Sequence, residues 1–469
     1  MRFSAATTAE RLLPESLVLR ARPLLDRLDE TLFSRGERGA AQRMSLIAFS
    51  IRILNAFIAI VSQVLLARWM GGFEYGIFVL VWVTAVIVGS LSCLGAHTAI
   101  IRYIPEYFEK GMLAELRGVL LTSRVFSAIA STLTAAIGIG ALFVLQPWLE
   151  DYYFRPFVLG MIAFPMIALG DVLQGISRAN SWAVSALSPT YFFRPILIIA
   201  FMALALAAGY PATAVTAVIA ALAATYITTI SQWIYVTFHA DARVPDGPRT
   251  YLFSEWFKVS LPIFLVESFF FLMTNADVLM VGRYMEPHDV GIYYATVKTL
   301  ALVHFVYFAV KAGVAQRYAR FSHGENRTEL AAFARETVSW TFWPSLAMAA
   351  IVLLIGKPLL GLYGPGFDEG YALLFPLAAG VIARAAVGPA ESLLTMSGHQ
   401  NACAWVYGVT LALNIALSMA LIPLFGLWGA AFATAGSMVF EAAALSFTAW
   451  RKLGIGMAIF LPSPKGSAL

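Results

Sequence analysis

The stretch "ARWMGGFEYGIF", residues 67–78, occurs twice in this chain in slightly altered form. The second copy reads "GRYMEPHDVGIY" and occupies residues 282–293, so the two copies lie 215 positions apart. Both copies hold Arg, Met, Gly and Ile at the same places, an acidic residue in the middle and an aromatic residue at the end. A glycine- and aromatic-rich phrase that returns half a chain later indicates a fold made of two similar halves.

The composition is that of an integral membrane protein. The 469 residues are 60% hydrophobic and only 13% charged, with a mean hydropathy of +0.76. A soluble globular domain is about 45–50% apolar and about 25% charged. The net charge of +5 is explained by the Lys and Arg residues that membrane topology requires in cytoplasmic segments, so no nucleic-acid partner is expected. Cys93 and Cys403 both lie in apolar runs, which predicts neither a disulfide nor a metal site.

Apolar runs of about 20 residues, the length that crosses a bilayer, occur twelve times. The predicted spans are 46–67, 77–99, 119–145, 156–176, 190–209, 212–237, 259–282, 290–311, 336–356, 371–394, 402–423 and 429–450. With the N-terminus inside, the segments on that side carry 24 Lys and Arg residues and the outside loops carry four, which are Arg68, Arg155, Arg283 and Lys357. The positive-inside rule therefore predicts that both termini are cytoplasmic.

The repeat extends beyond the quoted phrase. "FP" at 164–165 returns at 375–376, and "GYPATAV" at 209–215 aligns with "GLWGAAF" at 426–432. Spans 1–6 are therefore repeated as spans 7–12, and an even number of helices per repeat makes the halves parallel. The predicted fold is an all-α polytopic membrane protein with two six-helix lobes around a central cavity.

The chain divides accordingly into five parts. The first is a cytoplasmic N-terminal segment, 1–43, with a candidate amphipathic helix at 14–33. It is followed by the N-lobe (44–240), a cytoplasmic linker (241–258), the C-lobe (259–452) and a cytoplasmic tail (453–469). The loops show no phosphate-binding glycine pattern, no metal-ligand spacing and no nucleophile motif, so we predict no enzyme and no metal cofactor.

Charged residues inside the predicted spans are the candidate functional groups, because each costs about 2.5–3.5 kcal/mol to insert at a helix centre. The cations are Arg52, Arg124, Lys298 and Arg384, and the acids are Asp171, Glu267, Asp277, Glu391 and Glu441. Arg124, Asp171 and Glu391 lie near cytoplasmic span ends, where long side chains can reach the interface. The structural alternative is static pairing, Asp277 with Lys298 and Glu441 with Arg384.

Two polar stripes indicate a wet cleft. Asn55 and Gln63 share a helical face with Arg52, while Thr274 shares one with Glu267. Arg52 and Glu267 are repeat equivalents, so they can face one another across a two-fold axis. We predict that they meet in one conformation and separate in another.

Four stretches resemble the polysaccharide-biosynthesis flippases of the multidrug/oligosaccharidyl-lipid/polysaccharide exporter superfamily. They are "LLARWMGGFEYGIFVL", "DVLMVGRYMEPHDVGIYYATVK", "LYGPGFDEGYALLFPLAAG" and "GLWGAAFATAGS", and the resemblance runs from about residue 44 to 452. It implies alternating access and movement of a polyprenyl-pyrophosphate-linked oligosaccharide from the cytoplasmic to the periplasmic leaflet of a bacterial inner membrane. It also implies coupling to a gradient of H⁺ or Na⁺ and no other cofactor.

The resemblance gives the intramembrane charges expected roles. Cations suit a pyrophosphate, so Arg52, Lys298, Arg384 and Arg124 are its candidate contacts. The candidate ion-coupling or gating acids are Glu267, Asp277, Glu391 and Asp171, and the candidate cavity stripe is Asn55, Gln63 and Thr274. Expected partners are the lipid-linked oligosaccharide, membrane lipids and other polysaccharide assembly proteins. A multidrug/cation antiporter of the same superfamily and a lipid II flippase remain alternatives, whereas the short external loops disfavour a membrane enzyme.

Overall fold

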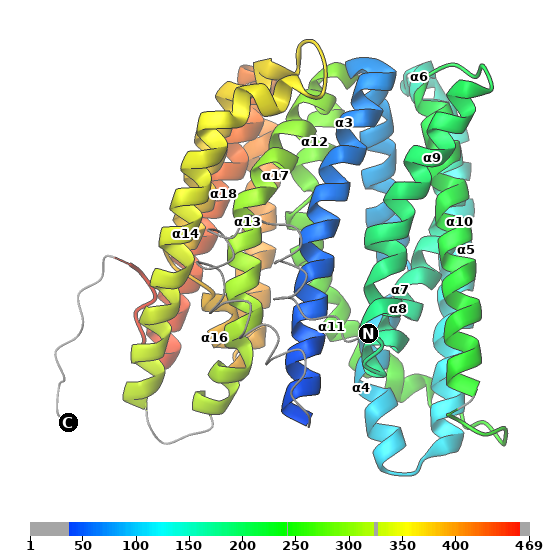
Figure 1. Cartoon of the computed structure of the whole chain (residues 1–469), viewed down its shortest axis with the longest axis vertical. Helices are drawn as coiled ribbons and strands as arrows, with labels where there is room; N and C mark the ends of the chain where they lie inside the picture. Colours follow the sequence, from blue (N-terminus) through cyan, green and yellow to red (C-terminus); the bar gives the residue numbers. More distant parts are fainter. Residues whose placement is uncertain (1–36, 242, 323–326, 460–469) are drawn as a thin grey trace, which may run out of the picture.

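The fold is a bundle of long helices, seen in a computed structural model that describes residues 37–241, 243–322 and 327–459. These residues contain no β-strand. The first half of the chain lies on the right of Figure 1 and the second half on the left. The all-α polytopic class predicted from composition is confirmed. The amphipathic helix expected at 14–33 lies outside the described residues.

The helices of each half follow the predicted order of spans. The first half comprises α3 (Glu37–Leu91), α4 (Ala96–Glu109), α5 (Leu113–Leu145), α6 (Asp151–Ile162), α7 (Phe164–Ala179), α8 (Ala183–Ser188), the π-helical turn η2 (Pro189–Phe193), α9 (Arg194–Ala207) and α10 (Ala214–Asp241). The second half comprises α11 (Phe253–Met273), α12 (Ala276–Tyr284), α13 (Pro287–Ser322), α14 (Arg327–Gly361), the 3₁₀ segment η3 (Phe367–Leu373), α15 (Leu374–Ala385), α16 (Ala390–Met396), α17 (Gln400–Phe425) and α18 (Leu427–Leu453).

Ten helical segments in the described part of the chain are long and apolar enough to cross a membrane. The first, Phe57–Leu91, contains predicted spans 1 and 2, because α3 bends at Gly71. Gly71 has φ 75° and ψ 166°, a backbone conformation that residues with a Cβ rarely adopt. Helices α11 and α12, separated by a two-residue break, occupy predicted span 7. The six-plus-six pattern therefore accounts for all the long helices.

We name the two ends of the bundle after a residue that each one contains. The Gly71 end, at the top of Figure 1, holds the bend of α3 and the connection between α9 and α10. The Glu391 end, at the bottom, holds α4, α16 and the link between α10 and α11. The connection after α9 falls at 208–213, as the sequence predicted. The longest predicted external loop, 356–370, is instead mostly helical, because α14 continues to Gly361 and η3 begins at Phe367.

The largest hydrophobic cluster joins the two halves at the Gly71 end. One large cluster there contains buried residues of both halves, including Tyr75, Tyr293 and Tyr363. Towards the Glu391 end the core divides into a cluster built on α4, α5, α7 and α10 with Trp256 of α11, and a cluster built on α13, α14, α16, α17 and α18. The two lobes thus share their largest core at one end, while at the other end the start of α11 packs against the N-lobe.

Candidate functional site

A cavity of about 710 Å³ lies between the lobes toward the Glu391 end. Both halves of the chain contribute polar groups to its wall. The ionisable and amide side chains that line it are His97, Asp171, Gln174 and Arg178 from the first half, and Lys311, Glu391 and Gln400 from the second. A cavity to which both lobes contribute charged and amide side chains is an arrangement in which a charged group can be bound without direct contact with hydrocarbon.

On the C-lobe side, the cavity leads into a buried chain of alternating charges. Lys311 forms a salt bridge with Glu391, and the other Glu391 carboxylate oxygen lies 4.0 Å from Arg384. Arg384 in turn lies 3.3 Å from Glu441, whose side chain is 1% exposed. The guanidinium of Arg384 also stacks over the ring of Tyr307 at 4.8 Å. Two cations and two anions balance, so the chain can remain ionised in the lobe interior.

On the N-lobe side, α7 presents its charges along one face. Asp171, Gln174 and Arg178 are separated by three and four residues and all face the cavity. The imidazole of His97, from α4, lies 3.0 Å from the Cys93 sulfur through its Nδ1 atom. In the described residues, Asp171 and Arg178 of this wall form no salt bridge with each other, whereas Lys311 and Glu391 of the opposite wall are paired.

The buried cation Arg194 lies behind this wall. Its side chain, on α9, is 9% exposed. It packs beside α7 where Gly170 has no side chain, since a Cβ there would lie 3.8 Å from its guanidinium. The charge pattern in the sequence had not singled Arg194 out, because it falls at the start of an apolar run.

The Gly71 end is closed by the two copies of the repeated phrase, which pack against each other. A Cβ at Gly76 would overlap the Pro287 carbonyl group, and a Cβ at Gly291 would lie 3.0 Å from the Gly72 carbonyl oxygen. Gly76 and Gly291 are repeat equivalents, and so are Gly72 and Pro287. The contact is therefore reciprocal about a two-fold axis, as in an isologous interface.

Aromatic rings seal the same end. Tyr75 is 0% exposed, and its ring lies 5.8 Å from Phe367, 6.4 Å from Tyr363 and 6.5 Å from Tyr294. Its hydroxyl donates a hydrogen bond of 2.9 Å to the Gln63 side chain. The structure is thus closed between the lobes at the Gly71 end, with its shared cavity toward the Glu391 end.

The predicted site residues lie in different regions of the structure. Asp171 and Glu391 line the cavity, and the expected pairing of Arg384 with Glu441 is present. Gln63 lies at the closed end, and Thr274 is exposed.

The suggested Asp277–Lys298 pair is replaced by other contacts. Buried Asp277 accepts a hydrogen bond of 3.0 Å from the Tyr293 hydroxyl. The Lys298 ammonium lies 4.8 Å from the centre of the Tyr294 ring. The two side chains thus point to successive tyrosines of α13, which the sequence spacing could not specify.

Arg124 lies on α5 and donates a hydrogen bond of 3.4 Å to the Thr237 hydroxyl on α10, away from the cavity wall described above. The side chains of Arg52, Asn55 and Glu267 lie outside the described residues, so their expected roles stay predictions. Lys311, the last residue of the predicted span 290–311, was not a candidate site residue, but α13 continues to Ser322 and Lys311 lines the cavity wall.

Comparison with known proteins agrees with this geometry. Residues 43–315, more than half of the chain, match the family described as polysaccharide biosynthesis protein, and residues 262–420 match the MatE family. No curated protein sequence matches the chain significantly.

Solved structures with the same fold share little sequence with the chain. An inward-facing multidrug resistance MATE family transporter of the MOP superfamily has a TM-score of 0.70 at 13% identity, over 87% of this chain and 98% of that one. The lipid II flippase MurJ in an inward closed conformation has a TM-score of 0.65 at 13% identity, over 86% and 87%. A MOP superfamily transporter from Pyrococcus furiosus has a TM-score of 0.61 at 13% identity, over 88% and 96%.

The chain is a multi-pass membrane protein whose two-lobe fold is the fold of these MOP superfamily structures. Within that class the chain belongs to the polysaccharide biosynthesis protein family.

Proposed function

We propose that this protein is a flippase for a polyprenyl-pyrophosphate-linked oligosaccharide in the bacterial inner membrane, acting in surface polysaccharide synthesis. The positive-inside rule predicts cytoplasmic termini, and on that topology the cavity would face the cytoplasmic leaflet, where such lipids would be loaded. The observation that carries the proposal is the cavity between the lobes. It holds cations from both halves, Arg178 and Lys311, while the opposite end is closed.

A pyrophosphate requires cations because its charge is costly to move without hydration. Arginine can bind phosphate oxygens with two hydrogen bonds, and lysine supplies a compact charge. Lys311 is already paired with Glu391, so an entering pyrophosphate competes with that carboxylate. Glu391 keeps Arg384 as a second neighbour at 4.0 Å, which lowers the cost of releasing Lys311. Substrate entry thereby rearranges the buried charge chain of the C-lobe.

Coupling to H⁺ or Na⁺ follows from the same exchange. When Lys311 turns toward substrate, Glu391 loses its nearest cation and becomes the group that would take up a proton or sodium ion. The ion would come from the periplasm while the cavity faces outward, and once substrate has left and the lobes have returned, the Lys311–Glu391 pair would re-form and expel the ion into the cytoplasm. Inward flow of the ion would then drive outward movement of the substrate. In this scheme no further cofactor takes part.

One residue that lines the same cavity would suit a multidrug/cation antiporter. Asp171 on the N-lobe wall has no role in binding pyrophosphate and would favour an organic cation. Arg178, about two helical turns further along the same face of α7, would repel a cation and so disfavours that function. The match to the polysaccharide biosynthesis family favours the flippase.

The test is complementation of a strain from which the gene has been deleted. We expect lipid-linked glycan to accumulate in the inner leaflet of the deletion strain, and wild-type protein to restore its export. Lys311→Ala should fail to restore export, although the protein remains in the membrane. Arg451→Ala, which removes an exposed cation at the end of α18, is the matched control and should restore export.

The alternatives give different results. An unchanged glycan pool in the deletion strain, together with lost resistance to cationic dyes, would identify the antiporter. Normal export by Lys311→Ala would show that the cavity cation is not a substrate contact.

A further inference from the structure

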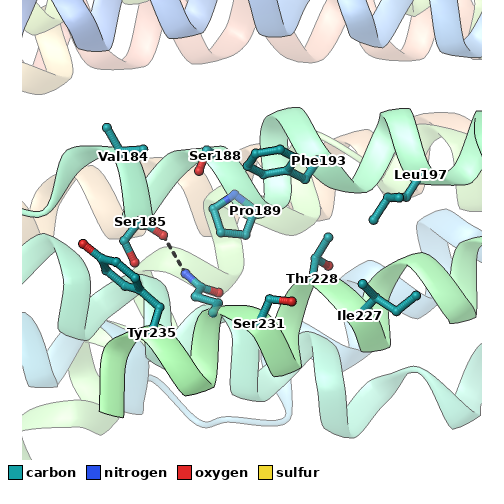
Figure 2. A pocket seen from close by; sticks show the side chains of 11 residues that line it. Val184, Ser185, Ser188, Pro189, Phe193, Leu197, Ile227, Thr228, Ser231 and Tyr235 are labelled. Carbon is teal, nitrogen blue, oxygen red and sulfur yellow. Dashed lines mark hydrogen bonds between the residues drawn. The ribbon is translucent and has the colours of Figure 1, made fainter. Parts of the chain in front are cut away.

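A second cavity lies on the outer surface of the N-lobe, away from the cavity between the lobes. It is a groove of about 410 Å³ between α8, η2 and α9 on one side and α10 on the other (Figure 2). Its wall is mainly apolar and includes Val184, Phe193, Leu197 and Ile227. The segments Ala183–Ala207 and Ala214–Ala240 are both candidate membrane spans. The groove therefore opens sideways into the hydrocarbon of the bilayer.

A π-helical turn shapes one wall of this groove. The Arg194 backbone N–H donates to the Pro189 carbonyl, five residues earlier rather than four. The inserted residue re-aims the side chains around it, so that Phe193 is 50% exposed at the groove and Arg194 points inward. Across the groove, the Gln232 amide donates a hydrogen bond of 2.8 Å to the Ser185 carbonyl (Figure 2). Such π turns are concentrated at functional sites.

A cationic aromatic cluster stands at the Glu391 end of the groove. Tyr235, which lines the groove, stacks on the His239 ring at 3.9 Å, and Trp182 lies 5.6 Å from the same ring. The guanidinium of Arg243 lies over Trp182 at 5.3 Å and hydrogen-bonds to Asn180. His239 donates a hydrogen bond to the Tyr235 carbonyl through Nδ1, so the imidazolium form has its Nε2–H left to donate to an anion. Aromatic and basic side chains together suit the headgroup level of a membrane.

We propose that the groove holds one acyl chain of an anionic phospholipid, whose phosphate is bound by Arg243 and His239. The apolar wall accepts the chain, and the cluster at its end supplies the complementary charge. Because the groove is open along its side, with Val184 59% exposed, the bilayer can fill it without any movement of the lobes. The inference is independent of what the central cavity transports.

The position of the groove favours a bilayer phospholipid over the polyprenyl carrier. Helix α7 separates the groove from the central cavity: Ser177 contacts Ser185 in the groove wall at 3.0 Å, while Gln174 and Arg178 face the cavity. A lipid whose chain lies in the groove therefore keeps its headgroup on the outside of α7. A bound phospholipid would instead support the helix whose other face forms the transport site.

The test uses the full chain in nanodiscs with phosphatidylglycerol that carries a photoreactive group on one acyl chain. Cross-links should map to 184–197 and 227–235, and unlabelled phosphatidylglycerol should compete better than phosphatidylcholine. Ser231→Trp, which fills the groove, should abolish this labelling. Arg243→Gln should weaken it about fivefold, the effect of one basic residue near an anionic lipid.

Matched controls are Ile219→Trp, on an exposed face of α10 outside the groove, and Arg451→Gln. Both should label as wild type. If Ser231→Trp fails to fold, Val184→Trp at the exposed rim provides the same block. The proposal is overturned by equal labelling in the blocked variant and its control, or by equal competition from phosphatidylcholine. Displacement by polyprenyl phosphate at a lower mole fraction than phosphatidylglycerol would also overturn it, and would assign the groove to the carrier.

Discussion

Replacing Gly76 by alanine should open the Gly71 end of the protein. In the present structure a Cβ at this position would overlap the carbonyl carbon and oxygen of Pro287, which belong to the other lobe. The obstacle is backbone, so it cannot be relieved by a side-chain rotation, and the lobes must move apart. Since Gly76 and Pro287 touch only when this end is closed, the substitution raises the free energy of the closed state selectively.

The size of the effect follows from the cost of overpacking a close contact. Such substitutions cost about 1–3 kcal/mol. A differential free energy of that size shifts a two-state equilibrium by about 5- to 150-fold. Gly291→Ala should act in the same direction but more weakly, because its Cβ would lie 3.0 Å from the Gly72 carbonyl oxygen, a gap that a small shift can relieve.

The assay is a distance measurement between spin labels at Glu150→Cys and Lys357→Cys, two exposed positions at the Gly71 end on opposite lobes. Both native cysteines are buried, so labelling remains on the introduced ones. Gly76→Ala should move the population to longer distances. Gly361→Ala is the matched control, because a Cβ there meets no other atom within 4 Å. Identical distance distributions in Gly76→Ala and the control would refute the gate.

Three further outcomes are expected. Arg384→Met should lower the free energy of unfolding by about 3–5 kcal/mol, because it leaves the buried Glu441 charge uncompensated. Adding Glu441→Leu should recover most of that loss, measured by thermal unfolding, and equal melting temperatures of the single and double variants would contradict this. Arg117→Ala removes two hydrogen bonds, of 2.7 and 3.0 Å, to carbonyl groups of the linker between the lobes, and should speed its proteolysis relative to wild type. Reporter fusions at Gly72 and Gly247 should read periplasmic and cytoplasmic, and the opposite reading at either would break the six-plus-six topology.

The repeat was readable from the sequence, but the contact it makes was not. A glycine at 76 and another at 291 indicate two similar turns, since each position tolerates close backbone approach. That the two turns meet each other depends on how the lobes tilt, which is a long-range property of both cores. Tyrosines near a membrane surface are common at the headgroup level, yet Tyr75 and Tyr363 are buried in the contact between the lobes. Composition alone cannot separate these two uses of a tyrosine near a membrane surface.

Among the charged residues that line the cavity, the sequence pattern singled out the acids but not the cations. Glu391 and Asp171 stand in apolar surroundings, where an acid is conspicuous, and both line the cavity. Lys311 stands at the end of an apolar run and resembles an ordinary boundary residue. Its helix continues to Ser322, because a helix does not end where hydrophobicity ends. Arg194 was overlooked for the same reason at the start of a run, although it is 9% exposed.

The doubled phrase at 67–78 and 282–293 has a physical reason in this arrangement. A contact on a two-fold axis uses the same surface of both partners, so each lobe must present the same small backbone patch there. Gly76 and Gly291 provide that patch, and the first atoms a Cβ would meet at either position belong to the backbone of the other copy. Contacts of this kind are either made or broken, which suits a switch between two states. The cavity toward the opposite end has no such requirement, and there the charges of the lobes differ: the C-lobe buries the pair Arg384 and Glu441 behind Glu391, whereas in the described residues of the N-lobe the single cation Arg194 is buried behind the wall formed by α7. Symmetry is thus retained where the lobes must fit each other, and the cavity, where the proposed substrate would bind, is free of that constraint.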